Sequence, residues 1–276
     1  MIDSHRHFWH YSAASFPWID DSMRVLTRDF LPDEVLSLGT FETNAGCIAV
    51  QAQQCHTETA WLLSLSETHR ELLGVVGWVD LCAKNAAAHL EIFNRHQRFV
   101  GVRHLVQDEA DPKFLERADF RRGLAELGRL GLCYDLLVRA PQRQAAIDLV
   151  RAFPNQIFVL DHVGKPAIAA GERDPWQRQL RELAQYENVV CKLSGLCTEA
   201  DWKGWRDADI SPFVEIALAC FGPTRLLFGS DYPVCQLGGT PERIVAAHLD
   251  PLRQLSPTEF QAITHTNAVR VYGLSA

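Results

Sequence analysis

The chain has 276 residues, 47% of them hydrophobic, and a formal net charge of −7 with a pI near 5.9. This length and apolar content suit one large domain or two smaller ones. An acidic chain is a poor partner for nucleic acid, because neutralising phosphates needs a basic surface. The sequence has no uninterrupted run of about 20 apolar residues that would predict a membrane span. It begins with a polar strand and not with a signal peptide, so we expect a cytoplasmic protein.

Eight cysteines are scattered along the chain without a CxxC pair, and several lie in apolar runs. This usage predicts buried free thiols in a reducing compartment, and argues against a disulfide framework or a structural zinc site.

The first predicted strand, Ile2–Trp9, carries His5 and His7 two residues apart. Side chains at positions i and i+2 of a strand point the same way, so both imidazoles can converge on one point. Such a pair begins a divalent metal site or a paired acid/base site. A surface histidine pair near the N-terminus is the alternative.

Short β-branched runs then alternate with helical patterns along the chain. The predicted strands after the first are Cys47–Ala52, Leu73–Asp80, Val100–Val106, Cys133–Val138, Ile157–Gly164, Val189–Gly195 and Leu226–Pro233. Eight strands alternating with helices predict a distorted (β/α)8 barrel of the α/β class, as one domain over residues 1–276. The competing fold is an open doubly wound sheet, but no G-x-G-x-x-G follows the first strand.

Local signals mark several helix ends. The stripe Phe120, Leu124, Leu127 and Leu130 ends at Gly131. Three later helices are expected to begin at Asp174-Pro175, at Ser211-Pro212 with an end at Gly222, and at the capping box Ser256–Glu259. The long connection from His10 to Leu31 predicts a lid over the barrel mouth, or else a segment packed on the barrel side.

Polar residues gather where the predicted strands end, which is where barrel enzymes carry their chemistry. His5, His7, His162 and Asp231 could meet around one centre as ligands of zinc or manganese, with positions left for water. The same residues also fit a metal-free hydrolytic site, with Asp231 as general base and cationic groups polarising a carbonyl.

Several longer strings resemble the amidohydrolase superfamily, and within it the branch that hydrolyses sugar-acid lactones. They are the HxH pair, Gly101–His104, Leu160–Pro166, Cys191–Gly195 and Leu227–Pro233. Further likeness, at Gln107–Asp111, Thr198–Trp202 and Val234-Cys235, implies a substrate such as L-fucono-1,5-lactone or a related aldonolactone. Strand four offers Arg103 and His104 where many binuclear members carry a bridging lysine, so a two-metal centre is not expected.

The resemblance implies a role for each matching residue. We expect Asp231 to act as general base, Arg103 and His104 to hold the oxyanion, and Asp231 or His162 to return a proton to the ring oxygen. One divalent cation (Zn or Mn) would sit on His5, His7, His162 and Asp231, or the enzyme would work without metal. The expected substrate-binding residues are Trp9, Trp18, Gln51, Glu58, Trp78, Lys165 and Trp202.

Two other functions, and other roles for Arg103 and Lys192, stay open at this stage. One is a metal-dependent decarboxylase of an aromatic or unsaturated acid, because related branches use similar ligands. Another is a non-catalytic binding protein on the same fold. Arg103 could also be a structural arginine paired with Asp80 or Asp135, and Lys192 either faces the substrate or forms a buried ion pair. The sequence does not indicate an oligomeric state.

Overall fold

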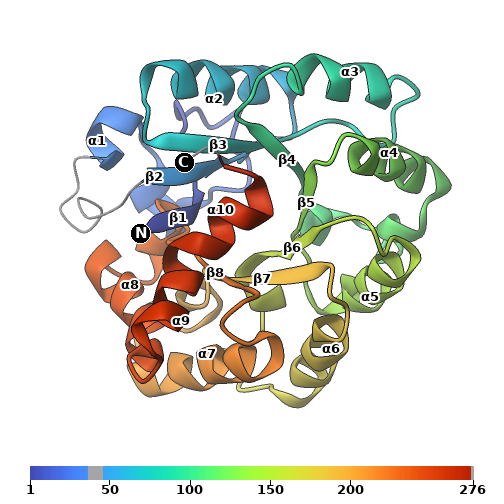
Figure 1. Cartoon of the computed structure of the whole chain (residues 1–276). Coiled ribbons are helices and arrows are strands. Elements are labelled where there is room, and N and C mark those ends of the chain that lie inside the picture. Colours follow the sequence, from blue (N-terminus) through green and yellow to red (C-terminus); the bar gives the residue numbers. More distant parts are fainter. Residues whose placement is uncertain (37–45, 275–276) are drawn as a thin grey trace.

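Eight parallel strands surround a central axis, with helices outside them, in the computed structural model of Figure 1, which describes residues 1–36 and 46–274. The strands pair in chain order. They are β1 (Ile2–Arg6), β2 (Gly46–Val50), β3 (Leu72–Gly77), β4 (Phe99–His104), β5 (Cys133–Leu136), β6 (Phe158–Leu160), β7 (Val189–Leu193) and β8 (Leu226–Phe228). Nearly every strand residue is buried, as expected for strands covered on both faces.

The barrel closes between β1 and the segment that follows β8. Arg6 and Tyr232 form a parallel bridge, and the Ser4 hydroxyl donates to the Phe228 carbonyl at 2.6 Å. The predicted single-domain (β/α)8 barrel is therefore confirmed.

The outer layer consists of ten α-helices among the described residues. They are α1 (Pro32–Leu36), α2 (His56–Thr68), α3 (Ala86–Phe93), α4 (Ala118–Arg129), α5 (Arg143–Ala152), α6 (Asp174–Ala184), α7 (Asp207–Phe221), α8 (Pro241–Leu249), α9 (Pro257–Gln261) and α10 (Asn267–Tyr272). The capping box at Ser256 is present as predicted. The start predicted at Ser211 is wrong, because α7 begins at Asp207 and accommodates Pro212 inside it, although it does end before Gly222.

All eight strands end earlier than predicted at the end that faces the site, and the difference is largest for the sixth and the eighth. These two were expected to reach Gly164 and Pro233 but end at Leu160 and Phe228. Beyond those ends the backbone turns left-handed, with φ of 52° at His162 and 60° at Asp231. A left-handed residue cannot continue a strand, so these two side chains leave the strand ladder.

The two ends of the barrel are covered differently. At the amino ends of the strands, Ala268, Val271 and Tyr272 of α10 pack against inward-facing apolar residues, and α10 crosses this end in Figure 1. At the carboxyl ends lies the segment from His10 to Leu31, which contains the 3₁₀ helix η1 (Asp21–Leu26). All eight cysteines are free thiols. Among the described residues, no helix has both the length and the apolar character that a membrane crossing requires.

Candidate active site at the carboxyl ends of the strands

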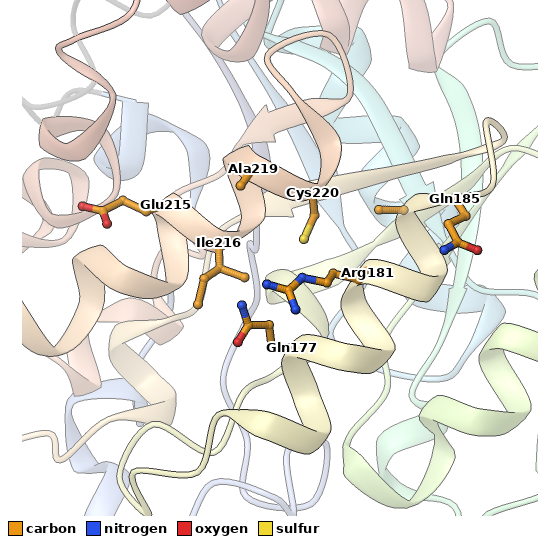
Figure 2. A pocket seen from close by; sticks show the side chains of 8 residues that line it. Gln177, Arg181, Gln185, Glu215, Ile216, Ala219 and Cys220 are labelled. Atoms are coloured by element: carbon orange, nitrogen blue, oxygen red, sulfur yellow. The ribbon is translucent and has the colours of Figure 1, made fainter.

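A cavity of about 300 Å³ opens at the carboxyl ends of the strands. Its lining includes His7, Ala52, Arg103, Leu105, Leu137, His162, Lys165 and Asp231 from strand ends, and Trp18 and Met23 from the His10–Leu31 segment. That segment therefore covers the barrel mouth, as the lid hypothesis predicts. A second groove lies on the outer layer between α6 and α7, lined by Gln177, Arg181 and Ile216, away from the strand ends (Figure 2).

Two histidines and one aspartate meet at the floor of the cavity. His5, His162 and Asp231 are buried, and each places a ligand atom within 4.8 Å of the other two. The Nε2 atom of His7 lies 3.4 Å from Oδ1 of Asp231, and its Nδ1 donates to the Val50 carbonyl at 2.8 Å. The two histidines of the first strand thus converge, as their spacing predicts.

The charges at this floor are set by burial and by mutual attraction. Burial by itself would raise the pKa of Asp231, but His162, His7 and His5 hold that pKa below its ordinary value. Burial lowers the pKa of His162 to about 4, with Asp231 opposing the shift. At neutral pH the floor therefore holds a carboxylate beside a neutral imidazole, which is the state that a general base requires.

Arg103, which lines the cavity, and Lys192, which does not, belong to a network of buried ion pairs at this floor. Arg103 Nη1 donates to Asp161 at 3.0 Å and lies 3.1 Å from His5 Nε2. Lys192 Nζ lies 2.5 Å from Asp135 and 3.2 Å from Asp161. Lys192 therefore forms the buried ion pair that was one of its two predicted roles, and the partner of Arg103 is Asp161, not Asp80 or Asp135.

The donor set of this site fits one divalent cation. Two imidazoles and a carboxylate, with space for water, are ligands that zinc accepts. Oδ1 of Asp161 is buried and lies 3.2 Å from Lys192 Nζ and 3.4 Å from His5 Nδ1. A proton on Nδ1 of His5 directed at Asp161 would leave the Nε2 lone pair for a cation, a common support for metal-binding histidines, but the Lys192 ammonium also lies 3.2 Å from that Nδ1 and competes for it as a donor. Arg103 contacts the same Nε2, so a cation and the guanidinium would compete for it.

The cavity walls combine aromatic and charged side chains. Trp18 and Trp202 line it, and the Trp202 indole is fixed by a 2.8 Å hydrogen bond to the Thr198 carbonyl. Lys165 forms an ion pair of 3.0 Å with Glu199 at the same wall. Sequence reasoning missed Glu199 as a site residue, although it lies within the quoted string Thr198–Trp202.

His104 does not line the cavity, so the structure does not place it at the oxyanion as expected. Its Nε2 is 2.6 Å from Glu109, and its ring stacks on Phe114 at a centroid distance of 4.6 Å. Consecutive residues of a strand point to opposite faces. Because Arg103 points into the barrel, His104 must point outward to the helices. The same alternation could have identified Ser194, two residues after Lys192, which is hydrogen-bonded to Nδ1 of His162 at 2.9 Å.

Four other predicted substrate-binding residues also make structural contacts and do not line the cavity. Trp9 packs in an aromatic cluster and donates to the Arg28 carbonyl. The Gln51 amide donates to the Arg103 carbonyl, and the Trp78 ring packs on His56. The Glu58 carboxylate accepts from the backbone amides of Ala52 and Gln53. The polar group or ring of each of these residues is occupied by a contact within the protein. We therefore assign these four residues a structural role beside the site.

A barrel with histidine and aspartate side chains gathered at its strand ends is typical of a class of hydrolytic enzymes. Residues 2–274 match the profile of the amidohydrolase family, and the chain belongs to that family.

Known relatives are similar over most or nearly all of the chain. It is 42% identical to the L-fucono-1,5-lactonase of Burkholderia multivorans, with 99% of this chain and 96% of that protein aligned. The L-fucono-1,5-lactonase of Burkholderia ambifaria is 32% identical over 86% of this chain and 82% of its own length. A crystal structure of an amidohydrolase from Burkholderia multivorans with bound zinc superposes with a TM-score of 0.94 at 42% identity, over 99% of both chains. A dihydroxybenzoic acid decarboxylase from Polaromonas shares the fold alone, at 14% identity and a TM-score of 0.71 over 99% of this chain and 96% of that chain.

Proposed function

We propose that this enzyme hydrolyses a sugar-acid lactone, with L-fucono-1,5-lactone or a closely related aldonolactone as substrate. The observation that carries the proposal is the 42% identity, over 99% of the chain, to a protein named for that reaction. The cavity supports it, because carboxylate, imidazole and guanidinium groups meet at its floor and tryptophans line its wall. The decarboxylase alternative rests only on the shared fold.

Eight free thiols favour the cytoplasm as the location.

The groups at the floor divide the steps of the proposed reaction between them. Asp231 accepts a proton from the water that attacks the lactone carbonyl, since its carboxylate is ionised and buried beside the cavity. The guanidinium of Arg103 stabilises the charge that develops on the carbonyl oxygen, and its Nε is a donor with no partner among the described residues. Charge stabilisation of this kind typically contributes a few kcal/mol. Asp231 then returns that proton, directly or through His162, to the ring oxygen that leaves.

The walls would hold the sugar itself. Lys165 and Glu199 offer a donor and an acceptor to ring hydroxyls, and Trp18 and Trp202 offer flat apolar faces to the ring. His5, His162 and Asp231, with His7 beside them, would hold one zinc or manganese ion. When bound, such an ion supplies a Lewis acid that polarises a carbonyl or lowers the pKa of a water.

Initial rates of proton release from a panel of fresh aldonolactones test the proposal. Native enzyme is compared with Asp231→Asn and with Asp250→Asn, a control at an exposed carboxylate on the outer layer. We expect turnover of L-fucono-1,5-lactone, a fall in kcat of about 10²- to 10⁴-fold in Asp231→Asn, and no change in Asp250→Asn. Full activity of Asp231→Asn would refute the role of Asp231, and release of CO2 from an aromatic acid without lactone turnover would refute the function. Assays of chelated and zinc-loaded enzyme decide whether the ion is needed.

A further inference from the structure

The turn after β6 is left-handed over four consecutive residues. His162, Val163 and Lys165 have φ of 52°, 52° and 50°, with Gly164 at 68° between them. A residue with a Cβ atom loses roughly 1–2 kcal/mol in this conformation, so three of them within four residues need support from outside the turn. The turn carries two side chains of the cavity, His162 and Lys165.

That support comes from two side chains on the outer helices. Arg143, the first residue of α5, is buried and donates from Nε to the Gly164 carbonyl at 3.0 Å and from Nη2 to the Lys165 carbonyl at 2.8 Å. Trp176 of α6 donates to the Val163 carbonyl at 2.7 Å. Three successive carbonyls of the strained turn are thus held by side chains.

The guanidinium of Arg143 makes two of its hydrogen bonds to this turn. Its third described contact is to the amide oxygen of Gln179 at 3.2 Å, and no carboxylate is among its hydrogen-bond partners in the described part of the chain. A buried guanidinium without a paired anion is costly. Two donors in a rigid fork also match two neighbouring carbonyls, which an ammonium group cannot do.

We propose that Arg143 is a positioning residue for the reaction: it holds the left-handed turn 162–165 so that His162 and Lys165 face the substrate. This inference rests on the proposed lactone hydrolysis. Through the turn, Arg143 sets the place of His162, which is hydrogen-bonded to Ser194 at 2.9 Å, and of Lys165, which pairs with Glu199. A displacement of about 1 Å at such groups is enough to cost a large factor in rate.

The chain offers a matched control in Arg225. This arginine also donates to backbone carbonyls, those of Ala184, Tyr186 and Val189 at 2.8 to 3.2 Å, but it precedes β8 at the opposite end of the barrel. Each lysine substitution removes hydrogen bonds from an arginine side chain to backbone carbonyls. Arg143→Lys does so at the carboxyl ends of the strands, and Arg225→Lys does so at the amino ends. We expect kcat for the lactone to fall at least about tenfold in Arg143→Lys and less than about twofold in Arg225→Lys, with similar losses of Tm.

Two further readouts separate positioning from general destabilisation. Guanidinium ion added to Arg143→Gly should restore part of the lost kcat and should do nothing for Arg225→Gly. Hydrogen exchange followed by mass spectrometry should show faster exchange across residues 161–166 in Arg143→Lys only, because the Lys165 amide is bonded to the His162 carbonyl at 2.8 Å.

Equal kcat losses in the two lysine variants, or unchanged exchange across 161–166 in Arg143→Lys, would overturn the role of Arg143. Absence of lactone turnover by the native enzyme would instead refute the proposed function, while the exchange experiment would still decide whether Arg143 holds the turn.

Discussion

Gly195 lies against the ring of His162, and replacing it with alanine tests how closely that ring must be placed. A Cβ atom on Gly195 would lie 2.5 Å from Nδ1 and 2.7 Å from Cγ of His162. Ordinary contact needs about 3.5 Å, so the ring would have to move by about 1 Å. A shift of that size at a reacting group costs about 10² in rate. The backbone adds strain, because φ at Gly195 is 63° and alanine loses roughly 1–2 kcal/mol there.

Gly273 separates the two effects. It is left-handed with almost the same φ, 60°, but an added Cβ would meet nothing within 4 Å. Gly273→Ala should lose roughly 1–2 kcal/mol of unfolding free energy in urea from backbone strain, and Gly195→Ala should lose at least as much. Only Gly195→Ala should lose about 100-fold in kcat at saturating lactone. If Gly195→Ala keeps kcat within about twofold of the native value, the position of His162 does not limit the reaction.

Two further predictions concern buried charge. Lys192→Met leaves the carboxylates of Asp135 and Asp161 without their shared cation, so the free energy of unfolding in urea should fall by about 3–5 kcal/mol. The control Lys113→Met removes an exposed ion pair of 3.9 Å with Glu116, and its free energy of unfolding should fall by less than about 1 kcal/mol. Burial raises the pKa of Glu58 from 4.5 to about 7, so the folded state holds this proton more tightly than the unfolded chain. The stability due to Glu58 is then fully present below pH 4.5 and lost as the pH rises to about 7. The stability of the native protein relative to Glu58→Gln should therefore fall by about 3 kcal/mol across that range.

Either prediction has a clear contrary result. Equal losses in the two lysine variants would mean that Lys192 does not neutralise the buried carboxylates. A difference between native protein and Glu58→Gln that stays constant from pH 4 to pH 8 would mean that Glu58 has its ordinary pKa in the fold.

The order of the strands and the identity of the floor residues could be predicted from the sequence. Apolar runs alternating with helical patterns identify a parallel barrel, because each strand is buried on both faces. In a parallel barrel all carboxyl ends meet at one side, so His5, His7, His162 and Asp231 were expected there without any knowledge of contacts. Alternation along a strand also separates Arg103 from His104, a local rule that would have removed His104 from the site.

The tertiary structure alone decided which polar residues near the strand ends face the cavity. Glu58 and Gln51 fold back onto backbone groups, whereas Glu199 reaches Lys165 from another loop. These choices depend on contacts between segments far apart in the chain, and no local periodicity encodes them. The left-handed turn at 162–165 is the clearest case. Local preference disfavours it, and it persists because Arg143, from the preceding helix, satisfies its carbonyls once the barrel has closed.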